Sequence, residues 1–300
     1  MIRHIAFATS ARVRAGLAAV MLLQILGMTG ASAQGHTERA DAHEMAKQQG
    51  IYRSQGEKIP KGYVHQRGLS HYAELLPAGF EETLKKLGPE QQWLDIGAGS
   101  GQAILDYYAP QYARTENRSW TPGSGKARAV AVSIEDRRTS QWGQETERLA
   151  ADRVRYLFGK RLRDYGNDEL GKFQLITDVY GGFSYTEELS MFMEKVLGLL
   201  ALEGSFYSLL QSVKLEDGRD DPKTYYLTSL FDAAGRDVKV CSWLKRITCV
   251  EVSCESKSDW DAPTELIHVR KVCNGVSVPA LSRLKYEAGT PPGREFRLKP

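Results

Sequence analysis

The sequence predicts an α/β fold in which a doubly wound, mostly parallel sheet ends in antiparallel strands. From about residue 69, short apolar runs typical of buried strands alternate with helical stretches. A glycine-rich segment joins the first of these runs to the helix after it. Beyond residue 236 the apolar runs follow one another without long helices between them. Alternating strands and helices predict right-handed crossovers and a sheet covered on both faces. Strands that follow one another directly predict antiparallel pairing at one end of the sheet.

The first 33 residues have the pattern of a secretory signal. Three arginines precede an apolar stretch of 14 residues, 15–28, which is shorter than the roughly 20 residues that span a bilayer. Small residues at the spacing a signal peptidase accepts follow at Ala31-Ser32-Ala33. We therefore expect residues 1–33 to be removed and the mature chain to be exported, periplasmic or secreted, without stable membrane insertion. The alternatives are an uncleaved anchor, or a start at Met45 that would leave the protein cytoplasmic.

The remaining elements are expected in a simple order along the chain. Residues 34–68 are polar and predict an N-terminal arm. Two helices follow, with apolar residues at helical spacing over 69–76 and 80–87. Strands are expected at 93–96, 129–134, 154–158, 173–179 and 205–210, and then at 238–243, 247–254 and 266–272. The main domain should therefore span 69–280. The last residues, 281–300, hold three prolines and predict a flexible tail.

Composition and charge exclude several classes of protein. With 42% hydrophobic and 26% charged residues and a mean hydropathy of -0.40, the chain resembles neither a polytopic membrane protein nor a disordered one. The formal charge of +3 belongs entirely to the arginines of the first 33 residues. The rest of the chain is balanced, so we expect no nucleic-acid partner, which would call for clustered Lys and Arg.

All four cysteines lie in the C-terminal third, as Cys241, Cys249, Cys254 and Cys273. Their spacings contain no C-x-x-C pair, so no metal site is expected. An even, local set of cysteines in a chain with an export signal predicts two disulfides, for which three pairings are possible. The alternative is four buried thiols.

The strongest functional signal is the segment that carries Asp95, Gly97, Gly99 and Gly101, between the first strand and its helix. Glycines allow a tight turn and the close approach of a ligand, because no Cβ intervenes. The helix that follows offers N–H groups to a carboxylate or phosphate, and ligands of open α/β sheets bind at this end of the strands. The dinucleotide pattern G-x-G-x-x-G is not matched, because Gln102 takes the place of the third glycine. The alternative is a turn that serves only strand–helix packing.

The D-x-G-x-G-x-G pattern resembles motif I of the class I S-adenosylmethionine-dependent methyltransferases, which have a Rossmann-like fold. Similar elements follow in the family's order over roughly 65–215. The resemblance implies that S-adenosyl-L-methionine is the cofactor and that Asp95 and the three glycines bind it. It implies that Glu135 holds the ribose hydroxyls, with Asp136 as the alternative, and that Asp178 contacts the cofactor's methionine moiety or the acceptor. Residues just before the fold, including Tyr72, lie where family members carry a segment that closes over the cofactor.

The sequence also departs from the family. Lys160 and Arg161 stand where an acid usually faces the adenine, and no Asn/Asp-Pro-Pro-Tyr/Phe segment follows the fourth strand. The reaction expected is methyl transfer to an unidentified small-molecule or protein acceptor. The catalytic base is unknown, because its identity follows the acceptor. The alternatives are an exported non-catalytic binding protein that retains this fold, and a nucleotide-dependent oxidoreductase, which the glycine spacing disfavours.

Overall fold

The computed structural model describes residues 67–108, 125–211, 213–214, 225–226, 228–257, 264–286 and 294–300. The signal-like segment 1–33 and nearly all of the predicted arm, 34–68, lie outside the described residues, so both stay predictions. Among the helices that are described, none is both long and apolar enough to cross a bilayer.

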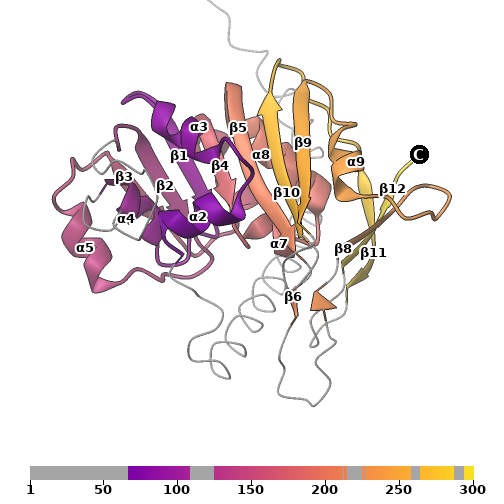
Figure 1. Ribbon diagram of the computed structural model, residues 1–300, viewed down its shortest axis with the longest axis horizontal. Helices are drawn as coiled ribbons and strands as arrows, with labels where there is room; N and C mark the ends of the chain where they lie inside the picture. The colour runs from indigo at the N-terminus through magenta and orange to yellow at the C-terminus, as the bar shows by residue number, and fades with distance from the viewer. Residues whose placement is uncertain are drawn as a thin grey trace, which may run out of the picture. The chain divides into compact units, whose positions relative to one another are not determined.

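A seven-stranded sheet with the order β3-β2-β1-β4-β5-β10-β9 forms the centre of the structure (Figure 1). The first five strands of this order are parallel, β10 is antiparallel to β5, and β9 is antiparallel to β10. The strands are β1 (Gln92–Ile96), β2 (Arg128–Val132), β3 (Val154–Leu157), β4 (Phe173–Asp178), β5 (Leu200–Gln211), β9 (Val250–Lys257) and β10 (Thr264–Lys271). The predicted doubly wound, mostly parallel, Rossmann-like sheet with an antiparallel C-terminal end is confirmed.

Helices cover both faces of this sheet because alternate strand residues point to opposite sides and both sets are apolar. In β1, Trp93 packs into one core and Leu94 into the other. The first core also receives α2 (Leu69–Leu75), α3 (Phe80–Lys86), α4 (Gln102–Tyr108) and α5 (Ser140–Thr146). The second receives η2 (Leu162–Asp164), α6 (Asn167–Leu170), α7 (Gly182–Tyr185), α8 (Leu189–Leu199) and α9 (Val240–Leu244). On α8 the buried residues recur at helical spacing, and the helix ends where Leu200 becomes extended and enters β5.

The prediction of a flexible tail over 281–300 is wrong. Its residues form β11 (Leu281–Tyr286) and β12 (Arg294–Leu298), which join β8 (Thr228–Phe231) in a second sheet of order β11-β12-β8. The physical reason is an alternation of buried side chains in β12 at Arg294, Phe296 and Leu298. The domain therefore extends past residue 280. A two-stranded ladder of β6 (Val213–Lys214) and β7 (Tyr225–Tyr226) completes the described strands.

A second correction concerns residues 238–243, which the apolar pattern predicts to be a strand. They lie largely in the short helix α9, with Val240, Trp243 and Leu244 buried. These three positions have the i, i+3, i+4 spacing of a helix face, although Val and Trp favour strands. Packing against the core has overridden the local preference.

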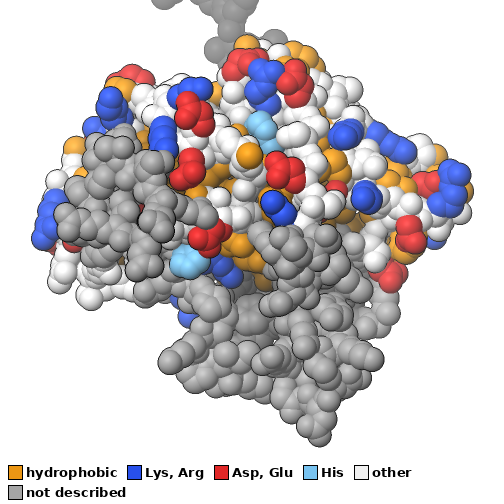
Figure 2. Space-filling view, viewed as in Figure 1, with side chains coloured by type: hydrophobic (Ala, Val, Ile, Leu, Met, Phe, Trp, Pro, Cys, Tyr) orange, Lys and Arg blue, Asp and Glu red, His pale blue; other side chains and the backbone are white. Residues whose placement is uncertain are grey.

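The cysteines form two disulfides, Cys241–Cys254 and Cys249–Cys273. The first joins α9 to the edge strand β9, and the second joins the residue before β9 to the segment after β10. Two predicted disulfides are thus confirmed, and one of the three possible pairings is selected. On the face shown in Figure 2, acidic and basic side chains are interspersed rather than gathered by sign.

Candidate functional site

The loop between β1 and α4 makes the tight turn that its glycines predict. Gly97, Gly99 and Gly101 have φ angles of 72°, 55° and 78°, in the left-handed region that favours glycine. A Cβ on Gly97 would lie 2.5 Å from the Cα of Gly181, and one on Gly101 would lie 2.2 Å from the ring of Trp142. At least two of the three glycines are therefore required by contacts within the chain, as the packing alternative expects.

The same loop lies at the point where the order of the sheet reverses. Strands β1 and β4 are neighbours, yet α4 after β1 packs into one core and α7 after β4 packs into the other. The two connections diverge at this point, which in open α/β sheets creates the crevice that binds ligands. The contact between Gly97 and Gly181 lies between these two connections.

Asp95 is completely buried at this switch point. Its carboxylate accepts hydrogen bonds from the Tyr72 hydroxyl at 2.9 and 3.0 Å and from Thr177 Oγ1 at 2.8 Å. Thr177 Oγ1 in turn accepts from Trp93 Nε1 at 2.8 Å. Burial raises the pKa of Asp95 to about 7, although the donors on Thr177 and Tyr72 oppose the rise. Asp95 thus holds α2 against the sheet.

Helix α2 belongs to the segment that the resemblance implies closes over the cofactor. Its start is fixed by Asp106, which accepts from the Leu69 backbone N–H at 2.8 Å and from Gln102 Nε2 at 2.7 Å. Just before α2, the guanidinium of Arg67 lies 4.4 Å from the ring centroid of Tyr180, which follows β4. The segment therefore contacts both connections at the switch point.

Glu135 follows the carboxyl end of β2, with a side chain that is 22% exposed and pairs with Arg137 at 2.6 Å. Its neighbour Asp136 pairs with Arg138 at 2.7 Å and is more exposed. Both acids thus follow the carboxyl end of β2, the end of the sheet at which the ligand is expected. Each has an arginine partner two residues along the chain.

Three aromatic residues near the carboxyl ends of β2 and β3 were not predicted as site residues. The Tyr156 hydroxyl donates to the carbonyl of Gly99, and its ring packs against Trp142 with centroids 5.2 Å apart. Phe158, one position past β3, is 46% exposed and lies under the guanidinium of Arg138 at 5.2 Å. The signal available in the sequence was the spacing of two between Tyr156, on β3, and Phe158, just past its end, because residues two apart in extended chain lie on one face.

Asp178, at the end of β4, is completely buried and caps the turn that follows. Oδ1 accepts from the Gly181 backbone N–H and Oδ2 from that of Phe183, each at 2.9 Å. Burial raises its pKa to about 7, while these backbone donors and the charge of Arg294 act in the opposite direction. The side chain is therefore engaged with its own chain, and its predicted contact with a ligand stays a prediction.

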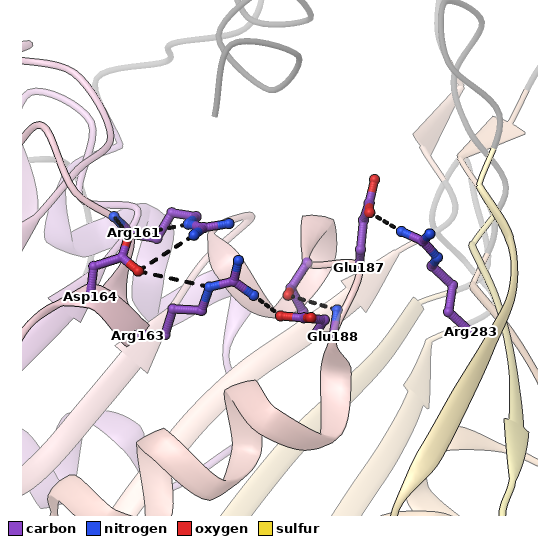
Figure 3. Close-up of polar contacts among 7 residues, drawn as sticks. Arg161, Arg163, Asp164, Glu187, Glu188 and Arg283 are labelled. Carbon is purple, nitrogen blue, oxygen red and sulfur yellow. Dashed lines mark hydrogen bonds and ion pairs between the residues drawn. The ribbon is translucent and has the colours of Figure 1, made fainter. Parts of the chain in front are cut away.

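Charged side chains on the segments after β3 and β4 form a row of ion pairs (Figure 3). Asp164 pairs with Arg161 and with Arg163, and Arg163 also pairs with Glu188. Arg161, which departs from the family pattern, is thus held by an acid of its own helical turn. Nearby, Glu187 pairs with Arg283 of β11.

No family model matches the sequence, and no curated protein matches it either. Among solved structures, an rRNA methylase from Streptococcus thermophilus is 10% identical with a TM-score of 0.42, over 70% of this chain and 99% of that one. A putative rRNA methylase from Clostridium thermocellum is 14% identical with a TM-score of 0.42, over 70% and 98%. The N-methyltransferase NodS from Bradyrhizobium japonicum, in complex with S-adenosyl-L-homocysteine, is 13% identical with a TM-score of 0.39, over 64% and 83%.

Proposed function

We propose that the protein is an S-adenosylmethionine-dependent methyltransferase that acts on a small-molecule or protein acceptor. The observation that carries the proposal is the position of the D-x-G-x-G-x-G loop. Its three glycines, all at positive φ, follow a buried aspartate at the switch point between β1 and β4. This combines the sequence resemblance with the place where open α/β sheets bind ligands.

The residues around the loop have chemistry that fits this cofactor. The backbone of 97–101 carries no Cβ at its three glycines, which permits the close approach of a ligand. Glu135 offers a carboxylate, the acceptor that a pair of ribose hydroxyls requires. The partly exposed ring of Phe158 offers a flat apolar surface for a purine.

The cofactor would supply an activated methyl group on a sulfonium. The protein then has to align the acceptor with that methyl group and exclude water. Segment 67–75 suits the second task, because it is fastened to β1 through Tyr72, to α4 through Asp106 and to the β4 connection through Arg67.

Replacing Glu135 by alanine should weaken the binding of S-adenosyl-L-methionine and of its demethylated product by at least about tenfold. Charge-assisted hydrogen bonds contribute roughly 1.5–3 kcal/mol each, and about 1.4 kcal/mol is a tenfold change. Calorimetric titration of the purified full chain measures this. Asp136→Ala is the matched control, since it removes the neighbouring acid and its own arginine pair. Weakening by Asp136→Ala alone would transfer the role to Asp136, and unchanged binding in both variants would contradict the assignment.

We further propose that the protein is exported and that its mature chain begins at Gln34. The two disulfides support this, because such bonds persist in oxidising compartments and are rare in the cytosol. Intact mass of the protein from fractionated native cells should match a chain that starts at Gln34 and gains four hydrogens on reduction. A cytosolic chain that starts at Met45 with four free thiols would overturn the proposal.

A further inference from the structure

Arg67, just before α2, brings a positive charge to the switch point. The residue is half-buried, and its guanidinium lies 4.4 Å from the ring centroid of Tyr180, which follows β4. Within the described part of the chain, no acid forms an ion pair with Arg67, and its contact there is the ring of Tyr180. A cation–π contact engages the face of a guanidinium, so the planar fork of N–H donors at its edge keeps the capacity to bind an anion.

Arg67 differs in this respect from the arginines that the structure describes just past the carboxyl ends of β2 and β3. Each of those forms an ion pair with an acid close to it along the chain: Arg137 with Glu135, Arg138 with Asp136, and both Arg161 and Arg163 with Asp164. Their charges are therefore already compensated within the protein. The charge of Arg67 is the one placed at the switch point without such a pair.

Tyr180 presents its ring to Arg67 from a strained backbone. Its φ of 54° lies in the left-handed region, which is uncommon for a residue other than glycine. In extended chain, Val179 and Tyr180 would point to opposite faces of the sheet. Both instead pack against the core on the side of α2 and α4. Strained residues cluster at active sites and ligand clamps, which indicates that the pair of Arg67 and Tyr180 belongs to the site.

The proposed orientation of the cofactor brings its carboxylate towards this pair. In S-adenosyl-L-methionine the purine, the ribose, the sulfonium and the amino-acid end follow one another. The proposed purine surface, Phe158, follows β3, and the proposed ribose ligand, Glu135, follows β2. The sheet continues from β2 to β1 and then to β4, with neighbouring strands about 4.8 Å apart. A cofactor whose purine lies at β3 therefore has its amino-acid end near β1 and β4, where Tyr180 and Arg67 lie.

A carboxylate at this place requires a cation, because the switch point already holds the buried acids Asp95 and Asp178. A further negative charge beside them is repelled unless a positive charge compensates it. A guanidinium does so with paired, charge-assisted hydrogen bonds from its planar donors. We propose that Arg67, stacked on Tyr180, binds the carboxylate of S-adenosyl-L-methionine. The inference rests on the proposed function and names the residue that recognises the amino-acid end of the ligand.

The test compares two ligands that differ only in this carboxylate, S-adenosyl-L-methionine and its decarboxylated form, by calorimetric titration of the full chain. Wild type should bind the first at least about tenfold more tightly, because the second lacks the acceptor of the charge-assisted hydrogen bonds. In Arg67→Met the two affinities should become nearly equal. A merely structural role of Arg67 would lower both affinities alike and leave their ratio as in wild type, which would overturn the proposal.

Further variants keep the test decisive. Arg67→Gln is neutral but polar, so it should fold even where Arg67→Met does not, and it should equalise the two affinities as well. Arg67→Lys retains the charge without the planar fork and should keep part of the ratio. Arg246→Met is the matched control for the loss of one positive charge, because Arg246 is exposed after α9 and should leave the ratio unchanged.

The failure of this inference and the failure of the proposed function give different results. If wild type binds both ligands with equal affinity, the role of Arg67 is overturned and the proposed function stands. If wild type binds neither ligand, the proposed function fails, and this inference fails with it.

Discussion

Replacing Gly97 by alanine should abolish cofactor binding and destabilise the domain together. At a φ of 72°, a residue with a Cβ is strained by about 1–2 kcal/mol. The new Cβ would also lie 2.5 Å from the Cα of Gly181, which is backbone and has to move. We expect the free energy of unfolding to fall by about 2–4 kcal/mol, or the Tm by about 5–15 °C. Thermal unfolding and calorimetric titration with S-adenosyl-L-homocysteine measure the two effects.

Gly235→Ala is the matched control for backbone strain. Its φ is 81°, and an added Cβ would have nothing within 4 Å. This variant should lose only about 1 kcal/mol and bind the ligand as wild type does. Full affinity in a folded Gly97→Ala protein would show that the ligand does not approach this loop. From the sequence alone, a β-branched residue at Gly97 is expected to abolish ligand binding and leave the fold largely intact, and the contact with Gly181 changes the expectation for the fold.

The sheet and the position of its glycine loop are predictable because both depend on local patterns. Apolar runs at strand spacing predict β1, β2, β4 and β10 to within a few residues. The glycines at 97, 99 and 101 allow a tight turn directly after the first of these strands. The strand pattern in residues 281–300, which form β11 and β12, is weaker. Three buried positions in β12 alternate with charged ones, and one of the three is itself an arginine.

The partners of the site acids could not be predicted, because they come from distant parts of the chain. Asp95 was expected to face a ligand, but the structure places Tyr72 and Thr177 on its carboxylate. Asp178 was expected to contact the cofactor's methionine moiety or the acceptor, and the structure shows in addition that its carboxylate caps the turn after β4. No periodicity marks such pairs, since each residue is a common type in a common position.

Removing either disulfide should lower the free energy of unfolding by about 3 kcal/mol through the entropy of the unfolded chain. The sequence separations are 13 for Cys241–Cys254 and 24 for Cys249–Cys273. Because the entropic effect grows only with the logarithm of the loop, the longer loop gains about 0.5 kcal/mol more. Loop length alone therefore predicts that removing Cys249–Cys273 lowers the free energy of unfolding slightly more than removing Cys241–Cys254.

The burial of the cysteine side chains reverses this order of the two stability losses. Cys241 lies in the core on α9, and Cys254 packs against the same core, whereas Cys273 is exposed. Replacing Cys241 and Cys254 by alanine also removes buried sulfur and leaves a space, which adds about 1–2 kcal/mol to the loss. This exceeds the loop difference, so we expect the Cys241→Ala, Cys254→Ala protein to be the less stable of the two double variants in denaturant unfolding. Equal stabilities, or the opposite order, would mean that the buried sulfur atoms of Cys241 and Cys254 contribute no more than the difference in loop length.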